Sequence, residues 1–311
     1  MSNRLLAIVG PTAVGKSALA VKVASLLDGE IVSADSRQVY RYMDIGTAKP
    51  SAEERDRAVH HLLDLVDPDE EYSLALFLRR ARGVIGEIEA RGRVPVVVGG
   101  TGQYVRALLE GWNVPEVPPD TALRAELEAR VESEGAAALY DELATVDPEA
   151  AARLDVRNPR RVIRALELHR RSPEASGHGA SRERRPIDAV VVGLTAERAE
   201  LYRRVDERVE SMLRAGWVGE VEGLVRRGYG IDLPSMSSLG YREIARHLSQ
   251  GVPLEDTAEE IKRRTRRFAR KQYAWFRLDD ERIRWFESMP DGLVAAAAYA
   301  VEAVGTARGP D

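Results

Sequence analysis

Residues 10–17 carry the strongest chemical signal in the sequence. They read Gly-Pro-Thr-Ala-Val-Gly-Lys-Ser, which matches the phosphate-loop pattern G-x-x-x-x-G-K-[ST] at every fixed position. The glycines permit a tight turn whose N–H groups face inward as an anion nest. The lysine supplies a full charge to the distal phosphate, and the serine hydroxyl can ligate Mg²⁺. A diphosphate or triphosphate site is therefore predicted at Gly10, Pro11, Thr12, Ala13, Val14, Gly15, Lys16 and Ser17, with Ser17 as the metal ligand.

Two further polar turns follow apolar runs that are typical of buried strands. Asp35 follows the run 30–34, and its carboxylate can serve as a general base or as an Mg²⁺ partner, or can instead cap a helix or turn. Thr101 follows the run 95–98, where Gly99 and Gly100 would let the backbone approach a ligand, or form a simple turn. No acid directly follows this second run, which weakens an interpretation as an ATP hydrolase. The turn after Asp35 is also polar, with Ser36, Arg37 and Gln38.

Basic residues gather in two stretches that predict contact with nucleic acid. Residues 262–272 carry many Lys and Arg side chains, although a solvated basic helix with acidic partners is the alternative. In the second stretch, 158–164, Arg160 and Arg164 lie one helical turn apart and share a face. The net charge is −4, yet a locally basic surface can still bind a phosphate backbone. The pair His60–His61 suggests a metal, but neighbouring strand residues point to opposite faces, so a structural role is favoured.

The elements that must position these residues alternate between strand and helix. Apolar runs at 5–9, 30–34, 60–66 and 95–98 predict parallel strands, and Ser73 is a candidate N-cap for a helix over 74–90. A Pro-rich run at 114–119 interrupts the alternation, and helical patterns follow to residue 171, with helix starts at Asp147-Pro148 and Asn158-Pro159. A strand over 189–194 restores the sheet. Later helices are expected at 196–215, 217–227, 241–248, 254–276 and 293–304, with an edge strand at 282–286.

This pattern predicts an α/β protein with a P-loop NTPase-like parallel sheet flanked by helices, an all-α insertion and a helical C-terminal part. The core would comprise residues 1–112 and 188–311, and the insertion residues 113–187. The content of 44% hydrophobic and 31% charged residues is ordinary for a globular protein, and the absence of cysteine excludes disulfides and thiolate metal sites. The early first strand and the lack of an apolar run of ~20 residues predict a cytoplasmic protein without membrane contact.

Taken in order, several motifs resemble those of the tRNA dimethylallyltransferase family, also called tRNA isopentenyltransferases. The phosphate loop alone is unspecific, whereas the whole series, which runs nearly end to end, is specific. Residues 43–50, Met-Asp-Ile-Gly-Thr-Ala-Lys-Pro, are close to diagnostic for the family. Two departures stand out: Ser176-Gly177-His178-Gly179 replaces a Ser/Thr-Gly-Lys-Pro-type loop, and Arg160 replaces a frequent glutamine. The other matching stretches are 35–40, 60–64, 66–68, 72–73, 99–104, 158–161, 164–167, 240–243 and 265–272.

The resemblance implies transfer of a dimethylallyl group from dimethylallyl diphosphate to N6 of adenosine 37 of tRNA, beside the anticodon. Asp35 would be the base, Thr101 would orient it or the adenosine, and Arg242 would join the phosphate loop and Mg²⁺ in binding the diphosphate. The enzyme would act as a monomer, and the insertion and the 262–272 helix would clamp the anticodon stem-loop. Contacts with tRNA are expected from Asp35, Ser36, Arg37, Gln38, Thr101, Arg124, Arg160, Arg161, Arg164, Arg266, Arg270 and Lys271.

Three alternatives compete with this interpretation. A relative that prenylates free adenine nucleotides would not need the basic insertion or the 262–272 helix. A P-loop small-molecule kinase of the shikimate-kinase type would place ATP in the phosphate loop, but such kinases lack the long helical second half. A non-catalytic RNA-binding module would not need Asp35 and Thr101 beside the phosphate loop.

Overall fold

A computed structural model of the chain describes residues 5–171 and 186–305. Contacts within the chain divide it into two compact units. Unit 1 comprises Met1–Glu110 and Pro186–Asp311, and unit 2 comprises Gly111–Arg185. The strands lie in unit 1, whereas the described part of unit 2 is helical.

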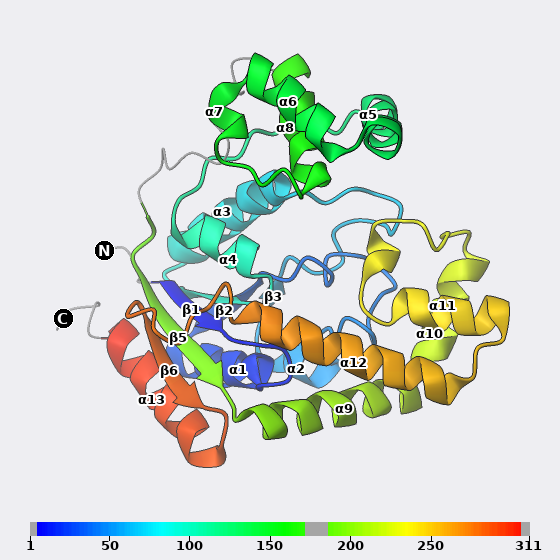
Figure 1. Cartoon of the computed structure of the whole chain (residues 1–311). Helices are drawn as coiled ribbons and strands as arrows, with labels where there is room; N and C mark the ends of the chain where they lie inside the picture. The colour runs from blue at the N-terminus through cyan, green and yellow to red at the C-terminus, as the bar shows by residue number, and fades with distance from the viewer. Residues whose placement is uncertain (1–4, 172–185, 306–311) are drawn as a thin grey trace. The chain divides into compact units, whose positions relative to one another are not determined.

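Unit 1 is built on a parallel sheet with the strand order β3-β2-β4-β1-β5-β6, six strands among the described residues (Figure 1). Ile8 of β1 and Ser33 of β2 both align with Val98 of β4, so the loops after these three strands begin at one edge of the sheet. Open α/β sheets bind their ligands at this carboxyl edge. The strands are β1 (Leu5–Val9), β2 (Gly29–Ser33), β3 (His60–His61), β4 (Val94–Val98), β5 (Ala189–Thr195) and β6 (Ile283–Glu287).

Helices cover both faces of the sheet. Helices α1 (Lys16–Leu27) and α13 (Pro290–Gly305) pack against each other on one face, and α3 (Leu74–Ala90) and α4 (Gly102–Leu109) lie together on the other (Figure 1). Opposite faces follow from right-handed crossovers, because the chain moves in opposite directions across the sheet from β1 to β2 and from β3 to β4. The main core lies between α1, α13 and the sheet and is made of buried Leu, Val, Ile and Ala side chains.

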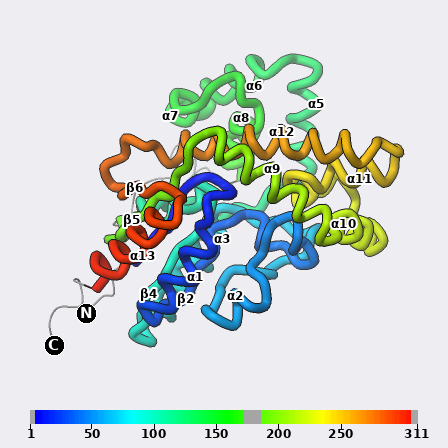
Figure 2. Tube along the Cα trace, turned by 90° about the horizontal axis from the view of Figure 1, so that it is seen from below, coloured from blue at the N-terminus to red at the C-terminus, as the bar shows by residue number. Residues whose placement is uncertain are grey.

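The C-terminal helices form a second core with the loop after β2. The long helices α9 (Arg198–Arg214) and α12 (Leu254–Gln272) run side by side in both views (Figures 1 and 2). Trp217, Tyr241 and Met43 are fully buried in this second core, which joins the loop to the helices. The smaller elements are α2 (Ala52–Arg57), α10 (Trp217–Arg226), the 3₁₀ turn η2 (Ser235–Ser237) and α11 (Tyr241–Gln250).

Unit 2 has its own apolar core. Leu127, Leu139, Leu143, Val162 and Leu166 are fully buried in it. The predicted helix starts at Asp147-Pro148 and Asn158-Pro159 are confirmed, since Asp147 accepts a hydrogen bond from the Ala150 amide and α8 begins at Pro159. The helices are α5 (Thr121–Glu134), α6 (Ala136–Val146), α7 (Pro148–Ala151) and α8 (Pro159–Arg171).

The α/β fold with a P-loop-like parallel sheet is confirmed. Among the local predictions, one cap is confirmed and two elements end earlier than predicted. Ser73 caps α3 as predicted, accepting a hydrogen bond from the Leu76 amide. The strand predicted over 60–66 ends at His61, because Leu62 and Asp64 adopt positive φ values of 65° and 55° and turn the chain away. Helix α12, predicted over 254–276, ends at Gln272. Within the described residues, no helix is long and apolar enough to cross a membrane.

Candidate functional site

The phosphate loop joins β1 to α1 at the carboxyl edge of the sheet. Gly10 has a φ of 136°, and a Cβ there would collide with the carbonyl oxygen of Leu194 on β5. Gly15 has a φ of 81° and is the N-cap residue of α1, while Ala13 also has a positive φ, of 67°. This sequence of turns directs the loop toward a helix N-terminus, the arrangement that binds phosphate.

Lys16 lies at the start of α1, with its ammonium against its own loop. Its Nζ donates a hydrogen bond to the carbonyl oxygen of Pro11 at 2.7 Å. Burial, reinforced by the nearby charge of Arg208 and opposed by that of Asp35, lowers the pKa of Lys16 to about 7. The site thus holds more positive charge than its surroundings neutralise, which favours an anion.

Asp35 and Thr101 belong to two neighbouring turns, and Ser36, the residue after Asp35, links them. The Asp35 carboxylate accepts a hydrogen bond from the Arg37 amide at 2.8 Å, and the Ser36 amide donates to Thr101 Oγ1 at 3.1 Å. These bonds fix the turn after β2 against the turn after β4. The negative charge of Asp35 also opposes, without reversing, the lowering of the pKa of Lys16 and of Arg208 that burial causes.

Arg208 is the site residue that the sequence analysis missed. It lies on α9, and burial lowers the pKa of its guanidinium while Asp35 opposes that shift. The available signal was its position in the helix: Leu201, Val205 and Val209 recur at four-residue intervals and are buried, and Arg208 lies beside that apolar stripe.

Asp35, Thr101 and Arg208 line one pocket of unit 1, together with Thr12 of the phosphate loop, and its volume is about 500 Å³. Its wall combines polar side chains from the loops after the strands and from α9 with apolar side chains of the C-terminal helices and loops. The polar lining includes Thr12, Asp35, Ser36, Arg37, Thr101 and Arg208, and the apolar lining includes Val209, Met212, Trp217, Leu239, Phe268 and Trp275. The pocket can therefore hold a molecule with an anionic end and an apolar part.

The glycines around Thr101 lie close to neighbouring parts of the protein. A Cβ on Gly99 would collide with the Ala34 backbone, one on Gly100 with Gln272 Nε2, and one on Gly102 with the Trp275 side chain. Gly99 and Gly100 thus make room for other parts of the protein, and because Gly100 also lines the pocket, close approach of a ligand to it stays a prediction.

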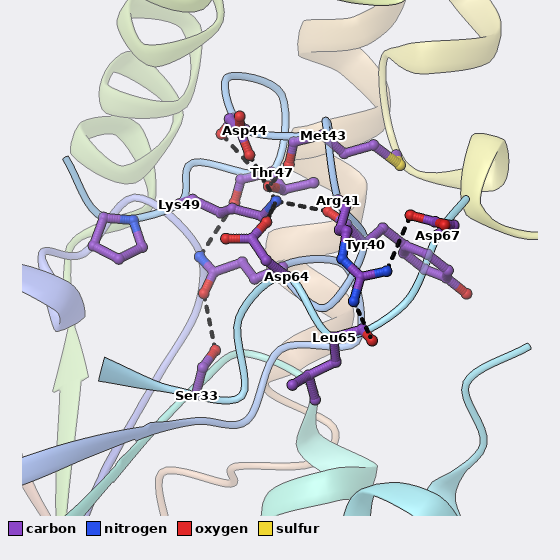
Figure 3. Close-up of polar contacts among 12 residues, drawn as sticks. Ser33, Tyr40, Arg41, Met43, Asp44, Thr47, Lys49, Asp64, Leu65 and Asp67 are labelled. Carbon is purple, nitrogen blue, oxygen red and sulfur yellow. Dashed lines mark hydrogen bonds and ion pairs between the residues drawn. The ribbon is translucent and has the colours of Figure 1, made fainter. Parts of the chain in front are cut away.

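The loop 40–50 forms another part of the wall and is held by a buried lysine. Lys49 Nζ, whose side chain is 1% exposed, contacts the Tyr40 carbonyl oxygen at 2.6 Å, Asp44 Oδ1 at 2.6 Å and Asp64 Oδ1 at 2.5 Å (Figure 3). Gln38 Nε2 donates to the carbonyl oxygens of Thr47 and Ala48. Gln38, predicted to contact tRNA, therefore has its amide bonded within this loop. The same bonds fix the position of Thr47 in the pocket wall.

Helix α10 holds the same loop from the other side. The Glu220 carboxylate accepts hydrogen bonds from the amides of Asp44 and Ile45, both at 2.7 Å, and from the Tyr241 hydroxyl at 2.7 Å. Gly46 lies so close to the Trp217 indole that a Cβ there would overlap the ring. The diagnostic motif at 43–50 therefore builds the pocket wall.

Of the basic residues in unit 1 that were predicted to bind the diphosphate or tRNA, some line the pocket and others do not. Arg37 lines the pocket and donates to the Pro234 carbonyl oxygen at 3.0 Å and to Ser237 Oγ at 3.1 Å. Arg242 is exposed, donates to the Ile231 carbonyl oxygen at 3.1 Å and is not part of the pocket wall. Arg266 pairs with Asp206 at 3.3 Å, which links α12 to α9. Arg270 and Lys271 are exposed, and Lys271 also lines the pocket.

In unit 2 the predicted RNA arginines separate into two kinds. Arg124 and Arg164 both contact Glu167, which is fully buried, at 3.0 Å and 2.5 Å. Arg160 and Arg161 are exposed at the start of α8. The departing motif Ser176-Gly177-His178-Gly179 lies outside the described residues.

The histidine pair forms the edge strand β3, and its two rings have different partners. His61 Nε2 contacts Glu30 Oε2 at 2.6 Å, and His60 Nδ1 contacts the Ala58 carbonyl oxygen at 2.8 Å. Among the described residues, no group of three or more His, Asp or Glu side chains is arranged to hold a metal ion. Ser17, in the first turn of α1, is the phosphate-loop residue whose hydroxyl could hold a cation together with phosphate oxygens.

A parallel sheet with a glycine-rich loop and a pocket at its carboxyl edge defines an α/β protein with a P-loop-like fold. The comparisons give the family. A model described as IPP transferase matches residues 38–279, and one described as Isopentenyl transferase matches residues 3–64. The chain belongs to the IPP transferase family.

Relatives and solved structures support this assignment over nearly the whole length. A tRNA dimethylallyltransferase of Roseiflexus castenholzii is 50% identical over 94% of this chain and 96% of the relative, and one of Chloroflexus aurantiacus is 52% identical over 88% and 93%. The tRNA isopentenylpyrophosphate transferase of Bacillus halodurans aligns with a TM-score of 0.71 at 41% identity, covering 99% of this chain and 100% of that one. A eukaryotic dimethylallyltransferase acting on tRNA aligns with a TM-score of 0.80 at 27% identity, covering 99% and 81%.

Proposed function

We propose that this chain transfers the dimethylallyl group of dimethylallyl diphosphate to N6 of adenosine 37 of tRNA and releases diphosphate. The observation that carries the proposal is that Asp35, Thr101 and Arg208 line one pocket with the phosphate-loop residue Thr12. A P-loop small-molecule kinase, the other enzyme considered, is disfavoured because relatives about half identical over most of the chain are named as dimethylallyltransferases.

The phosphate loop and two cations would bind the diphosphate. Residues Gly10–Ser17 supply the nest, and Lys16 and Arg208 supply charge from opposite elements, α1 and α9. Both side chains are buried enough for their pKa values to be lowered, so a diphosphate would relieve their mutual repulsion. This charge counts most as the leaving group gains negative charge in the transition state. Arg208 takes the role predicted for Arg242, which lies outside the pocket wall.

Asp35 would accept the proton from the adenosine. The bond from N6 to C1 of the dimethylallyl group forms as the C1–O bond to the diphosphate breaks, and the electron pair of that bond leaves with the diphosphate. The N6 proton passes to the Asp35 carboxylate, which the Arg37 amide holds in place. Thr101 positions this carboxylate through Ser36. A loop adenosine can be turned out of its stack into such a pocket at a cost of a few kcal/mol.

Mg²⁺ is the metal proposed for the reaction. Ser17 lies in the first turn of α1, where its hydroxyl can join the oxygens of a diphosphate in the loop. When bound, the ion supplies further positive charge to the leaving group. Lys16 and Arg208 bind and orient the same diphosphate from the protein side.

The surfaces for tRNA are proposed on each unit by itself. In unit 1 the exposed Arg270 and Lys271 lie at the end of α12, next to the pocket. In unit 2 the exposed Arg160 and Arg161 are available for phosphate contacts, and such contacts orient RNA without reading its sequence. A monomeric enzyme working in the cytoplasm completes the proposal, and sedimentation of the purified protein tests its oligomeric state.

The decisive experiment is a prenyl-transfer assay. Purified protein is incubated with Mg²⁺, labelled dimethylallyl diphosphate and an anticodon stem-loop that carries the target adenosine. Label is expected in the RNA at N6 of adenosine 37, and a stem-loop with guanosine at that position should accept none. Label transferred from γ-labelled ATP to a small metabolite would instead support a kinase.

A further inference from the structure

Gln272 connects three segments that meet at the phosphate loop. It is the last residue of α12 and is 3% exposed. Its Oε1 accepts a hydrogen bond from the Thr12 amide at 2.8 Å, and its Nε2 donates to the Gly100 carbonyl oxygen at 2.8 Å. One buried amide thus joins the phosphate loop, the turn after β4 and the end of the basic helix.

The glycine at position 100 fits this amide. A Cβ on Gly100 would overlap Gln272 Nε2, whereas its other near neighbours, Gln272 Cδ and Lys16 Nζ, would lie at 3.6 and 3.9 Å. Gly100 does not adopt the left-handed conformation, so alanine meets no backbone obstacle there. The need for glycine therefore comes from the position of the Gln272 side chain.

A second side chain supports the other half of the loop. Ser288 Oγ donates to the Val14 carbonyl oxygen at 2.8 Å and accepts a hydrogen bond from Arg204 at 2.6 Å. Gln272 holds the Thr12 amide and Ser288 holds the Val14 carbonyl, so residues distant in sequence fix the loop on both sides of Ala13, whose φ is 67°.

We infer that Gln272 is a positioning residue for the diphosphate: by holding the Thr12 amide and the Gly100 carbonyl, it keeps the phosphate loop in its binding conformation. The amides from Ala13 to Ser17 are then assigned to the diphosphate, and the Thr12 amide to Gln272. The inference rests on the proposed function of the loop as a diphosphate site. Without Gln272, two partly buried polar groups, the Thr12 amide and the Gly100 carbonyl, lose their partners, and the loop must be ordered when the ligand binds, which reduces affinity.

The first test uses Gln272→Met, which keeps the side-chain length and apolar packing but removes both hydrogen bonds. The matched control is Gln250→Met, because Gln250 is the exposed last residue of α11. Calorimetry with inorganic pyrophosphate and Mg²⁺ should show affinity about ten-fold weaker for Gln272→Met and unchanged for Gln250→Met. In the transfer assay the KM for dimethylallyl diphosphate should rise, while the KM for the stem-loop stays within about two-fold.

The second test uses the contact between Gly100 and Gln272. Gly100→Ala should weaken pyrophosphate binding as much as Gln272→Met, because the new methyl group displaces the amide. In a Gln272→Ala background the space is free, so adding Gly100→Ala should change the affinity by less than about two-fold. This non-additivity is expected only if Gly100→Ala acts by displacing the Gln272 amide.

The outcomes separate the inference from the function on which it rests. Pyrophosphate that fails to bind the wild-type protein would remove the proposed diphosphate site itself. Wild-type binding with unchanged affinity in Gln272→Met, or with only a lower melting temperature, would overturn the positioning role. Tighter binding by Gln272→Met would also overturn it, since it would mean that Gln272 competes with phosphate for the Thr12 amide. Additive effects in the double variant would overturn it as well.

Discussion

Two clusters of charged side chains, one in each unit, differ in how their charge is balanced. In unit 2, the buried carboxylate of Glu167 is surrounded by the guanidinium groups of Arg124 and Arg164 and by the Asp120 amide at 2.5 Å. In unit 1, the charges of Lys16 and Arg208 both interact with a single carboxylate, that of Asp35. The first cluster contains an acid with ample donors, and the second contains cations with too few acceptors.

The pKa directions follow this difference. Burial opposes ionisation of Glu167, but hydrogen bonds from Arg164, the Asp120 amide and Arg124 outweigh it and lower the pKa of the carboxyl. Burial and mutual repulsion instead lower the pKa of Lys16, and Asp35 only partly compensates. A satisfied buried charge fixes structure, whereas an uncompensated pair of cations indicates a place for an anion. Residues in the first cluster should therefore affect stability, and those in the second should affect catalysis and binding.

The largest effect is expected at Asp35. Asp35→Asn keeps the size of the side chain but removes the base, so turnover in the transfer assay should fall by about 10²–10⁴-fold. Because Asp35 lies in a pocket and not in the folded core, the thermal unfolding of the Asp35→Asn variant should stay close to that of the wild type. Turnover near the wild-type level would show that Asp35 is not the base, and a large loss of stability would erase the contrast between the two clusters.

Glu167→Gln, in the cluster of unit 2, should lower stability. It leaves two arginines without their carboxylate, which should cost about 2–3 kcal/mol of stability, less than for a fully buried pair because both arginines are about one-third exposed. Since the pKa of Glu167 is lowered, its stabilisation is present at neutral pH and lost on acidification, so the two proteins should converge in acid. Hydrogen exchange of the α5 and α8 amides measures the loss within unit 2. Exchange equal to the wild type at neutral pH would contradict this role.

The sequence predicted the fold better than it predicted the partners of its charged residues. Hydrophobic periodicity and the turn residues were enough for the sheet, for the Ser73 cap and for the helix starts at Pro148 and Pro159, because each depends on neighbours in the chain. The phosphate loop and Asp35 were found in the same way, since a parallel strand delivers the next loop to the carboxyl edge of the sheet.

The partners of several of these residues were not identified from the sequence. Arg208 was missed because its significance depends on Lys16 and Asp35, which are distant in sequence. The glycines at 99 and 100 were assigned to ligand approach because nothing local shows that Ala34 and Gln272 take up that space. Arg164 was assigned to RNA from its spacing to Arg160, although its partner Glu167 lies three residues further along the same helix. That spacing was visible, and a buried glutamate beside an arginine indicates structure before binding.

A smaller effect is expected in the protonation of Lys16. With a pKa of about 7, the ammonium loses its proton as the pH rises above neutrality. A bound diphosphate favours the charged form, so binding at pH 8 should take up a proton and weaken as the pH rises. Calorimetry of pyrophosphate binding in two buffers of different ionisation enthalpy measures this uptake. Lys16→Arg, which stays charged, is the reference, and equal uptake in both proteins would assign the proton to the ligand.

The smallest effects are expected at the surface of unit 2, where the comparison can be made within one helix. Arg161→Gln removes an exposed charge at the start of α8, and Arg164→Gln removes a partner of Glu167. If the exposed arginine contacts an RNA phosphate, its loss should weaken stem-loop binding a few-fold and reduce the salt dependence of log K by about one unit, without changing stability. Arg164→Gln should instead lower the stability of unit 2 and leave the salt dependence of the folded protein unchanged. Fluorescence titrations of a labelled stem-loop at several salt concentrations, together with hydrogen exchange, distinguish the two. The reverse pattern would mean that Arg164 binds RNA at the expense of its ion pair, and that a satisfied buried charge does not by itself identify a structural residue.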